Sequence, residues 1–256
     1  MIAEKMAHLH ALPIRATVER FLTETDFVVS EEACVLKHIH RYIELLPPDE
    51  SPMPENFKAV NILENYGKHK HAYPSEYPSR ADLLEEARFL KRILEGAKSP
   101  VAFCHNDLLL GNMLISPNQD SVSFIDFEYC GYNHTAYDIA DHFCEFAGNR
   151  DIDFSRYPSE AMQRDWLRVY LSTLKTITSS SSPSPDQGDP SVTSQSVGDE
   201  EINDWMREIR LFTMASHLLW GIWGMVQSFR SNINFDFKTY AIAKIGEYFR
   251  CKSLLK

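Results

Sequence analysis

The sequence of 256 residues is acidic, with 36 aspartates and glutamates against 26 lysines and arginines and a formal net charge of −10. This charge would repel nucleic-acid phosphates and anionic lipid surfaces, so neither is expected as a partner, whereas a cationic ligand or a divalent metal would be attracted. The 44% of hydrophobic residues suffice for a sizeable core. The five cysteines are odd in number and include no Cys-x-x-Cys pair, which indicates reduced thiols and a cytoplasmic location.

Helical spacing of apolar residues dominates the first hundred positions. It predicts helices over 2–11, which Pro13 ends, and over 31–46. The proline-rich segment 47–78 is expected to be a connection with one short helix near 56–65. A third helix is expected to begin at Ser79, which forms a capping-box sequence with Asp82.

Short apolar runs then replace the helical spacing. They lie at 101–104, 113–115 and 122–125, and the polar turn between the last two predicts a β-hairpin over 113–126. Further helices are predicted at 136–147, 159–177, 201–229 and 236–250. The sequence therefore predicts an α+β fold that is mainly helical.

Two segments of the second half have unusual compositions. Residues 178–199 contain eight serines and three prolines and are predicted to be a disordered surface insert. This insert could be a phosphorylation segment or simply a tolerated loop insertion. The uncharged stretch 211–229 is long enough to span a bilayer, but its polar residues favour a buried core helix, and no membrane span is expected.

The stretch from Cys104 to Glu128 has the pattern of a phosphoryl-transfer site. Asp107 is followed five residues later by Asn112, and Asp126 stands at the end of the predicted hairpin. An aspartate in the first position can accept a hydroxyl proton, and the other two residues offer oxygen ligands for Mg²⁺ that bridges nucleotide phosphates. The hairpin is expected to bring all three side chains to one end.

At these residues the sequence resembles the choline/ethanolamine kinase family, a branch of the protein-kinase-like fold. The matching motifs are His105-Asn-Asp107, Gly111-Asn112, Ile125-Asp-Phe-Glu-Tyr129, Tyr132-Asn133, Tyr137-Asp-Ile139 and His142-Phe143, and the resemblance runs from residue 1 to about 250. The resemblance implies that Asp107 is the catalytic base and that ATP and Mg²⁺ are the cofactors. It further implies that Asn112 and Asp126 hold the metal and that Glu128 supports the metal site.

Acidic residues are concentrated around this motif. Residues 101–165 contain eleven aspartates and glutamates, three arginines and no lysine, a composition that would attract Mg²⁺ and a cationic substrate. The polar residues on one face of the predicted helix 136–147 are Asp138, Asp141, His142 and Glu145. The sequence leaves open whether this face is functional or only solvated. The resemblance assigns Glu145 to the substrate ammonium and gives His105 and Asp138 structural roles at the site.

Two tryptophans, Trp220 and Trp223, lie three residues apart in the long predicted helix. On sequence alone such a pair is more typical of a hydrophobic core than of a ligand-binding site. The resemblance reverses this interpretation, because in the family the equivalent pair forms part of the wall of an amine pocket. Tyr129 is expected to contribute a further wall.

The resemblance favours ethanolamine over choline as the substrate. A primary ammonium requires hydrogen-bond acceptors, whereas a quaternary ammonium is held best by aromatic faces. The segment 145–158 looks like ethanolamine kinases, because it lacks the Trp and additional tyrosines found there in choline kinases, and Leu108-Leu109 also looks ethanolamine-type. The implied reaction is ATP-dependent phosphorylation of the ethanolamine hydroxyl, the first step of the CDP-ethanolamine route to phosphatidylethanolamine, by an enzyme that is often a homodimer. The alternatives to an ethanolamine kinase are a choline kinase and, less in keeping with the 137–158 pattern, an aminoglycoside-phosphotransferase-like enzyme.

The nucleotide-covering lobe of a kinase is expected to be missing. Kinase-like enzymes hold ATP with a Gly-rich loop and a strand lysine, but only Gly67 and Gly96 precede Gly111, and residues 99–149 contain no Lys or Arg. By the resemblance, Met1 lies at or just beyond the hinge between two lobes, so 1–256 are expected to form the C-terminal lobe alone. Two hypotheses remain, an ethanolamine kinase or its large lobe, and a catalytically silent short form that binds an amine or a partner.

Overall fold

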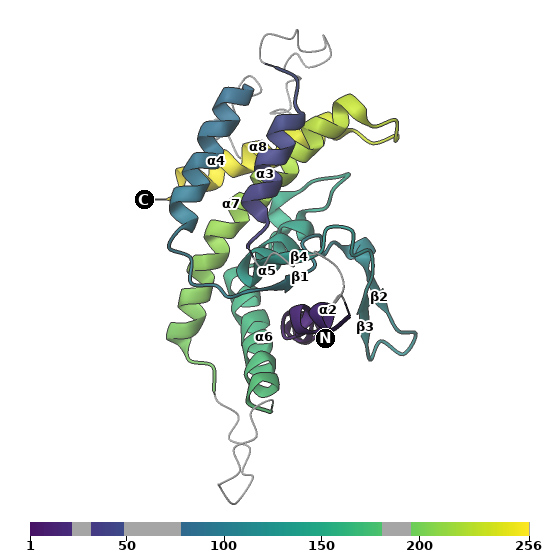
Figure 1. Ribbon diagram of the computed structural model, residues 1–256, viewed down its shortest axis with the longest axis vertical. Coiled ribbons are helices and arrows are strands. Elements are labelled where there is room, and N and C mark those ends of the chain that lie inside the picture. The colour runs from purple at the N-terminus through teal and green to yellow at the C-terminus, as the bar shows by residue number, and fades with distance from the viewer. Residues whose placement is uncertain (22–31, 49–77, 181–195, 256) are drawn as a thin grey trace, which may run out of the picture.

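The computed structural model describes residues 1–21, 32–48, 78–180 and 196–255 (Figure 1). The N-terminal helices are α1 (Ile2–His10), α2 (Ile14–Phe21), α3 (Val35–Leu45) and α4 (Arg80–Leu94). The helix predicted near 56–65 lies outside the described residues, as does almost all of the connection that contains it. α2 was not predicted, because Pro13 ends one helix but also directly precedes the next, and proline is favoured at helix starts.

The start of α4 follows the predicted capping box. The backbone nitrogen of Asp82 donates to Ser79 Oγ at 3.1 Å, and the backbone nitrogen of Ser79 donates to Asp82 Oδ2 at 2.9 Å. These two bonds satisfy amide groups that the first turn of a helix leaves without intrahelical partners. The expectation of a helix beginning here is confirmed.

Four short strands form two antiparallel pairs within the described ranges. The strands are β1 (Val101–Cys104), β2 (Met113–Ile115), β3 (Val122–Phe124) and β4 (Gly131–His134). β2 and β3 make the predicted hairpin, with Met113 opposite Phe124, and it projects to the right of the helices in Figure 1. β4 was not predicted, and it pairs with β1.

The remaining helices occupy the second half of the chain. They are α5 (Thr135–Cys144), α6 (Glu160–Ser180), α7 (Asp199–Arg230) and α8 (Phe237–Ser253), with short 3₁₀ turns at Glu145–Ala147 and Phe154–Arg156. The fold is therefore mainly helical, as predicted. Residues 181–195 of the expected disordered insert lie outside the described residues, but both ends of the expected range are helical, since α6 continues to Ser180 and α7 begins at Asp199. The boundaries 178–199 were therefore too wide.

α7 is the central helix, and α8, α5, α3, α4 and α6 all contact it. Most of its residues between 212 and 226 are buried, which confirms the interpretation of 211–229 as a core helix. A Cβ added at Gly221 would lie 2.6 Å from Ile245 Cγ1 and 3.2 Å from the Ile245 backbone nitrogen. Glycine therefore allows α8 to approach α7 closely. No helix in the described part of the chain has the length and apolar character needed to cross a membrane.

α5 is buried on every side, because all ten of its residues are shielded from solvent. Its polar side chains are held by partners from other elements, and Asp138 and Asp141 are both 0% exposed. The alternative of a solvated acidic face is therefore wrong. Helical spacing identified the shared face correctly, but it could not show that other helices cover that face.

Candidate active site

The loop 105–112, here called the catalytic loop, rests on Asp138 of α5. The two carboxylate oxygens of Asp138 accept hydrogen bonds from the backbone nitrogens of His105 at 2.9 Å and Asn106 at 2.6 Å. His10 of α1 donates to the same carboxylate at 2.9 Å. Burial acts to raise the pKa of Asp138, but these hydrogen bonds and His10 hold it below its ordinary value. Asp138 therefore stays ionised and fixes the backbone of the loop.

His105 connects the catalytic loop to the segment that follows β3. Its Nε2 lies 2.9 Å from the backbone oxygen of Ile125, and its ring centroid lies 4.8 Å from that of Phe127. The side chain is fully buried. The imidazole therefore occupies a packing position between the two chain segments that carry Asp107 and Asp126.

Asn106 anchors the same loop to the segment that carries Tyr129. Its backbone has a φ of 65°, in the left-handed region that asparagine tolerates better than most residues. Its Nδ2 donates to the backbone oxygen of Tyr129 at 3.0 Å, and its Oδ1 accepts from Asn133 Nδ2 at 2.9 Å. Sequence reasoning missed this role, although an asparagine directly before the proposed base was visible in the motif.

Asp107 is half-buried and is held by Asn112. Asn112 Nδ2 donates to the Asp107 backbone oxygen at 2.9 Å and to its Oδ2 at 3.2 Å. Burial raises the pKa of Asp107 to about 7, and the nearby charge of Glu145 adds to the increase. A carboxylate with this pKa can exchange a proton at neutral pH.

The predicted metal ligands come together at the base of the β2–β3 hairpin. Asn112 directly precedes β2, and its backbone oxygen accepts from the Ile125 nitrogen at 3.0 Å, which places it beside the segment that carries Asp126. Asp126 has a φ of 62°, and the side chains of Asp126 and Glu128 are exposed. Because the amide nitrogen of Asn112 is used by Asp107, its oxygen is the atom that can coordinate. The three residues offer the hard oxygen donors that Mg²⁺ prefers.

Two other clusters of metal-ligand types occur among the described residues, His10–Cys104–Asp138 and His217–Glu247–Cys251. In each cluster the carboxylate already has a cationic or hydrogen-bonding partner, which is His10 for Asp138 and Arg250 for Glu247. Neither cluster includes a residue of the predicted metal site. Both are better explained as parts of the core.

The two tryptophans and Tyr129 form one aromatic cluster. Trp223 Nε1 donates to Tyr129 Oη at 3.1 Å, and the Trp220 ring centroid lies 5.2 Å from Tyr129 and 5.4 Å from Trp223. Tyr240 of α8 extends the cluster, with its ring 6.1 Å from that of Trp223. Sequence reasoning missed Tyr240, because only the packing of α8 on α7 brings it to Trp223.

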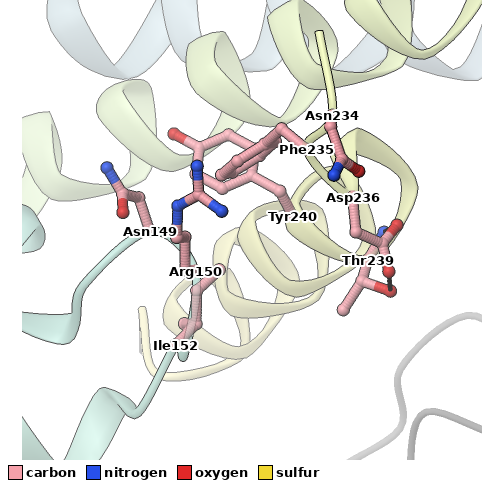
Figure 2. A pocket seen from close by; sticks show the side chains of 8 residues that line it. All are labelled: Asn149, Arg150, Ile152, Asn234, Phe235, Asp236, Thr239 and Tyr240. Atoms are coloured by element: carbon pink, nitrogen blue, oxygen red, sulfur yellow. Dashed lines mark hydrogen bonds between the residues drawn. The ribbon is translucent and has the colours of Figure 1, made fainter.

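A polar pocket of about 230 Å³ adjoins this aromatic cluster, and Tyr240 forms one of its walls (Figure 2). In Figure 2 the guanidinium of Arg150 points toward Phe235, and it lies 5.6 Å from the centre of that ring. Asp236 and Thr239, at the start of α8, are hydrogen-bonded to each other on the far side. Arg150 therefore places a cation over Phe235, whose ring contacts Tyr240 of the aromatic cluster.

A buried acidic group lies next to the aromatic cluster. Asp141 Oδ1 accepts from Ser216 Oγ and from Trp220 Nε1, both at 2.7 Å. Glu145, one helical turn later, accepts from Lys244 Nζ at 2.9 Å, and the side chains of Glu145 and Lys244 are 8% and 0% exposed. Sequence reasoning missed Lys244, because it lies 99 positions from Glu145 and on a different helix.

Glu145 also borders a cavity beside the catalytic loop. This cavity has a volume of about 710 Å³, and the loop residues Leu108, Leu109 and Leu110 form part of its lining. Glu145 thus connects the buried acids to a space beside the loop that can admit a small molecule.

Comparison with solved structures defines the class of fold. An ethanolamine kinase of Plasmodium vivax superimposes with a TM-score of 0.68 at 26% sequence identity, over 96% of this chain and 57% of that one. A choline kinase of Cryptosporidium parvum superimposes with a TM-score of 0.62 at 23% identity, over 99% of this chain and 64% of that one. The fold is therefore a kinase-like fold.

Sequence comparison defines the family. Residues 1–249 match the choline/ethanolamine kinase family, and the chain belongs to it. Ethanolamine kinase 1 of Mus musculus is 40% identical over 202 residues, which cover 79% of this chain and 50% of the mouse protein. The chain spans about half the length of this relative.

Proposed function

We propose that this chain is the C-terminal lobe of an ethanolamine kinase, and that it transfers the γ-phosphoryl group of ATP to the ethanolamine hydroxyl. The observation that supports this proposal best is the position of Asp107, which lies within electrostatic reach of Glu145 and of the residues proposed to bind metal. The name of the mouse relative supports the choice of amine.

Asp107 is the proposed catalytic base. A general base is most effective when its pKa lies near the working pH, and the pKa of about 7 for Asp107 meets that condition. It would accept the proton of the ethanolamine hydroxyl as the oxygen attacks the γ-phosphorus. The bonds from Asn112 would keep the carboxylate directed at that hydroxyl.

The nucleotide would lie on the hairpin side of the loop. Asn112 and Asp126 would hold Mg²⁺ with support from Glu128, and the ion would neutralise charge on the ATP phosphates.

The amine would lie against the aromatic cluster of Tyr129, Trp220 and Trp223. Aromatic faces attract cations, and buried carboxylates nearby, including Glu145, increase that attraction. The substrate would thus carry its ammonium toward the cluster and its hydroxyl toward Asp107. The five cysteines are free thiols, which suits the proposed cytoplasmic location.

The direct experiment measures phosphoethanolamine formed by this chain from ethanolamine, ATP and Mg²⁺. Asp107→Asn is expected to lower kcat by about 10²–10⁴-fold, the usual contribution of a general base. Asp120→Asn, an equivalent change in the exposed hairpin turn, should leave kcat unchanged. Faster phosphorylation of choline than of ethanolamine would show that the proposed substrate is wrong.

The second candidate is a catalytically silent short form that binds the amine or a partner without turnover. It is favoured by the lack of Lys and Arg over 99–149, which leaves no cation in that segment for the phosphates. Ethanolamine binding without phosphoethanolamine formation would support this candidate over the first.

A further inference from the structure

Lys244 already neutralises the carboxylate that the family resemblance assigns to the substrate ammonium. Its Nζ donates to Glu145 Oε1 at 2.9 Å inside the protein. Burial acts to lower the pKa of Lys244, but the charge of Glu145 holds it above its ordinary value, so the lysine remains a cation. The Lys244–Glu145 pair therefore has little net charge with which to attract a second ammonium.

Asp141 is in the opposite situation. It is 0% exposed, and its Oδ2 has no hydrogen-bond partner among the described residues. A buried oxygen without a hydrogen-bond partner is unfavourable, and more so when the group is charged. Burial raises the pKa of Asp141 well above its ordinary value, and the charge of Glu145 raises it further. Asp141 is thus a buried acid that lacks a cation at hydrogen-bond distance.

The position of Asp141 suits an ammonium held by the aromatic cluster. Its Oδ1 is fixed by the indole N–H of Trp220 and by Ser216, both at 2.7 Å. These two bonds set the orientation of the carboxylate, which leaves Oδ2 as the acceptor that is not used. The carboxylate lies at the edge of a ring proposed to form the wall of the amine pocket.

We propose that Asp141 Oδ2 accepts an N–H hydrogen bond from the substrate ammonium, and that this bond makes the site selective for a primary amine. The proposal rests on the proposed function, since it concerns the amine pocket of that enzyme. Because Oδ2 is shielded from water, entry of the ammonium requires a movement of the aromatic side chains, such as a break in the Trp223–Tyr129 hydrogen bond of 3.1 Å. A hydrogen bond made in this dry environment is stronger than one made in water.

Glu145 has a different role under this proposal. It forms an ion pair with Lys244 close to Asp141, and its interaction with the substrate would not depend on N–H groups. The two carboxylates stand one helical turn apart, so each serves as the matched control for the other. Replacing either one by its amide keeps the side-chain shape but prevents the group from forming a carboxylate. Asp141, whose raised pKa keeps it protonated in the absence of substrate, would release its proton when the ammonium binds.

The test measures binding by isothermal titration calorimetry with ethanolamine, its N-methyl and N,N-dimethyl derivatives, and choline. This series removes one N–H at a time while the cation is kept. The unaltered chain should bind the series with decreasing affinity. Asp141→Asn should weaken ethanolamine binding about 10- to 100-fold, as expected for the loss of a charge-assisted hydrogen bond, and should leave choline binding within about threefold.

Three results would overturn the proposal. The first is that Asp141→Asn binds ethanolamine as tightly as the unaltered chain does. The second is that Asp141→Asn loses equal affinity for ethanolamine and for choline. The third is that Glu145→Gln, and not Asp141→Asn, loses affinity in proportion to the number of N–H groups on the amine. If Asp141→Asn does not fold, the unaltered chain decides the matter, because choline binding as tight as ethanolamine binding refutes the role of Oδ2.

Failure of the proposed function gives a different result. A chain that forms no phosphoethanolamine but shows the predicted binding series would disprove turnover and leave the role of Asp141 intact. If the unaltered chain phosphorylates ethanolamine and Asp141→Asn has the same KM, the proposed function holds and the role of Asp141 is disproved.

Discussion

Removal of Lys244 tests the buried ion pair most directly. In the variant Lys244→Met, a side chain of similar length loses its charge, and Glu145 is left 8% exposed with Asp141 and Asp107 near it. Breaking a buried pair by removing one partner costs about 3–5 kcal/mol. Because folded domains have only about 5–15 kcal/mol of stability, the loss should be large and easily measured.

The magnitude follows from the burial of both partners. Lys244 is 0% exposed, so water cannot replace it beside Glu145 once the ammonium is gone. The double variant Lys244→Met/Glu145→Gln removes both charges, and it should recover most of the loss, because two buried neutral groups incur no ionic desolvation. The pair therefore predicts a strong coupling energy in a double-mutant cycle.

The assay is urea denaturation at pH 7, followed by far-UV circular dichroism with linear extrapolation. Lys175→Met is the matched control, because Lys175 and Glu201 form a pair of 2.7 Å whose side chains are 30% and 35% exposed. That control should cost less than about 1 kcal/mol. The reasoning is refuted if Lys244→Met costs no more than Lys175→Met, or if the double variant loses the sum of the two single losses.

Three further predictions concern stability. Gly221→Ala should lower the free energy of unfolding by about 1–2 kcal/mol in urea denaturation, because overpacking against Ile245 exceeds the gain in helix propensity. The control Gly96→Ala has nothing within 4 Å of the added carbon and should change stability by less than about 0.5 kcal/mol. Equal effects of the two variants would show that the contact between α7 and α8 can accept an extra carbon. The melting temperature of Asp141→Asn should rise relative to that of the unaltered chain as pH increases above about 4. Above this pH the unfolded aspartate ionises while the folded one, with its raised pKa, keeps its proton, so only the unaltered chain loses stability. A difference in melting temperature that stays constant with pH would contradict the raised pKa of Asp141. Ser79→Ala should lose about 1 kcal/mol through the capping box of α4, and an unchanged urea midpoint would count against it.

Local signals in the sequence were sufficient for most helices and for the hairpin. The capping box at Ser79 and the polar turn between β2 and β3 each specify structure within a few residues, and both were predicted. β4 was missed because Gly131-Tyr-Asn-His134 is short and partly polar, and only pairing with β1 makes it a strand.

The candidate site was less accessible to sequence reasoning. The motif around Asp107 and Asn112 could be identified because its residues lie within one loop and one hairpin. The partners of the buried acids could not, because Ser216 and Trp220 reach Asp141 from 75 and 79 positions away, and Lys244 reaches Glu145 from still further. Helical periodicity identifies a shared face, but it carries no information about which helix covers that face.

The side chain of Asn106 links two parts of the candidate site through its hydrogen bonds. Asn106 directly precedes the proposed base Asp107 and donates a hydrogen bond to the backbone of Tyr129, which belongs to the aromatic cluster. If the ammonium shifts Tyr129 on entering, the same displacement pulls on the loop that carries the base. If Asp107 and the aromatic cluster have the proposed roles, binding of the amine and alignment of Asp107 are mechanically linked. An amine too small or too large for the proposed pocket should then lower the rate even when its hydroxyl can reach Asp107.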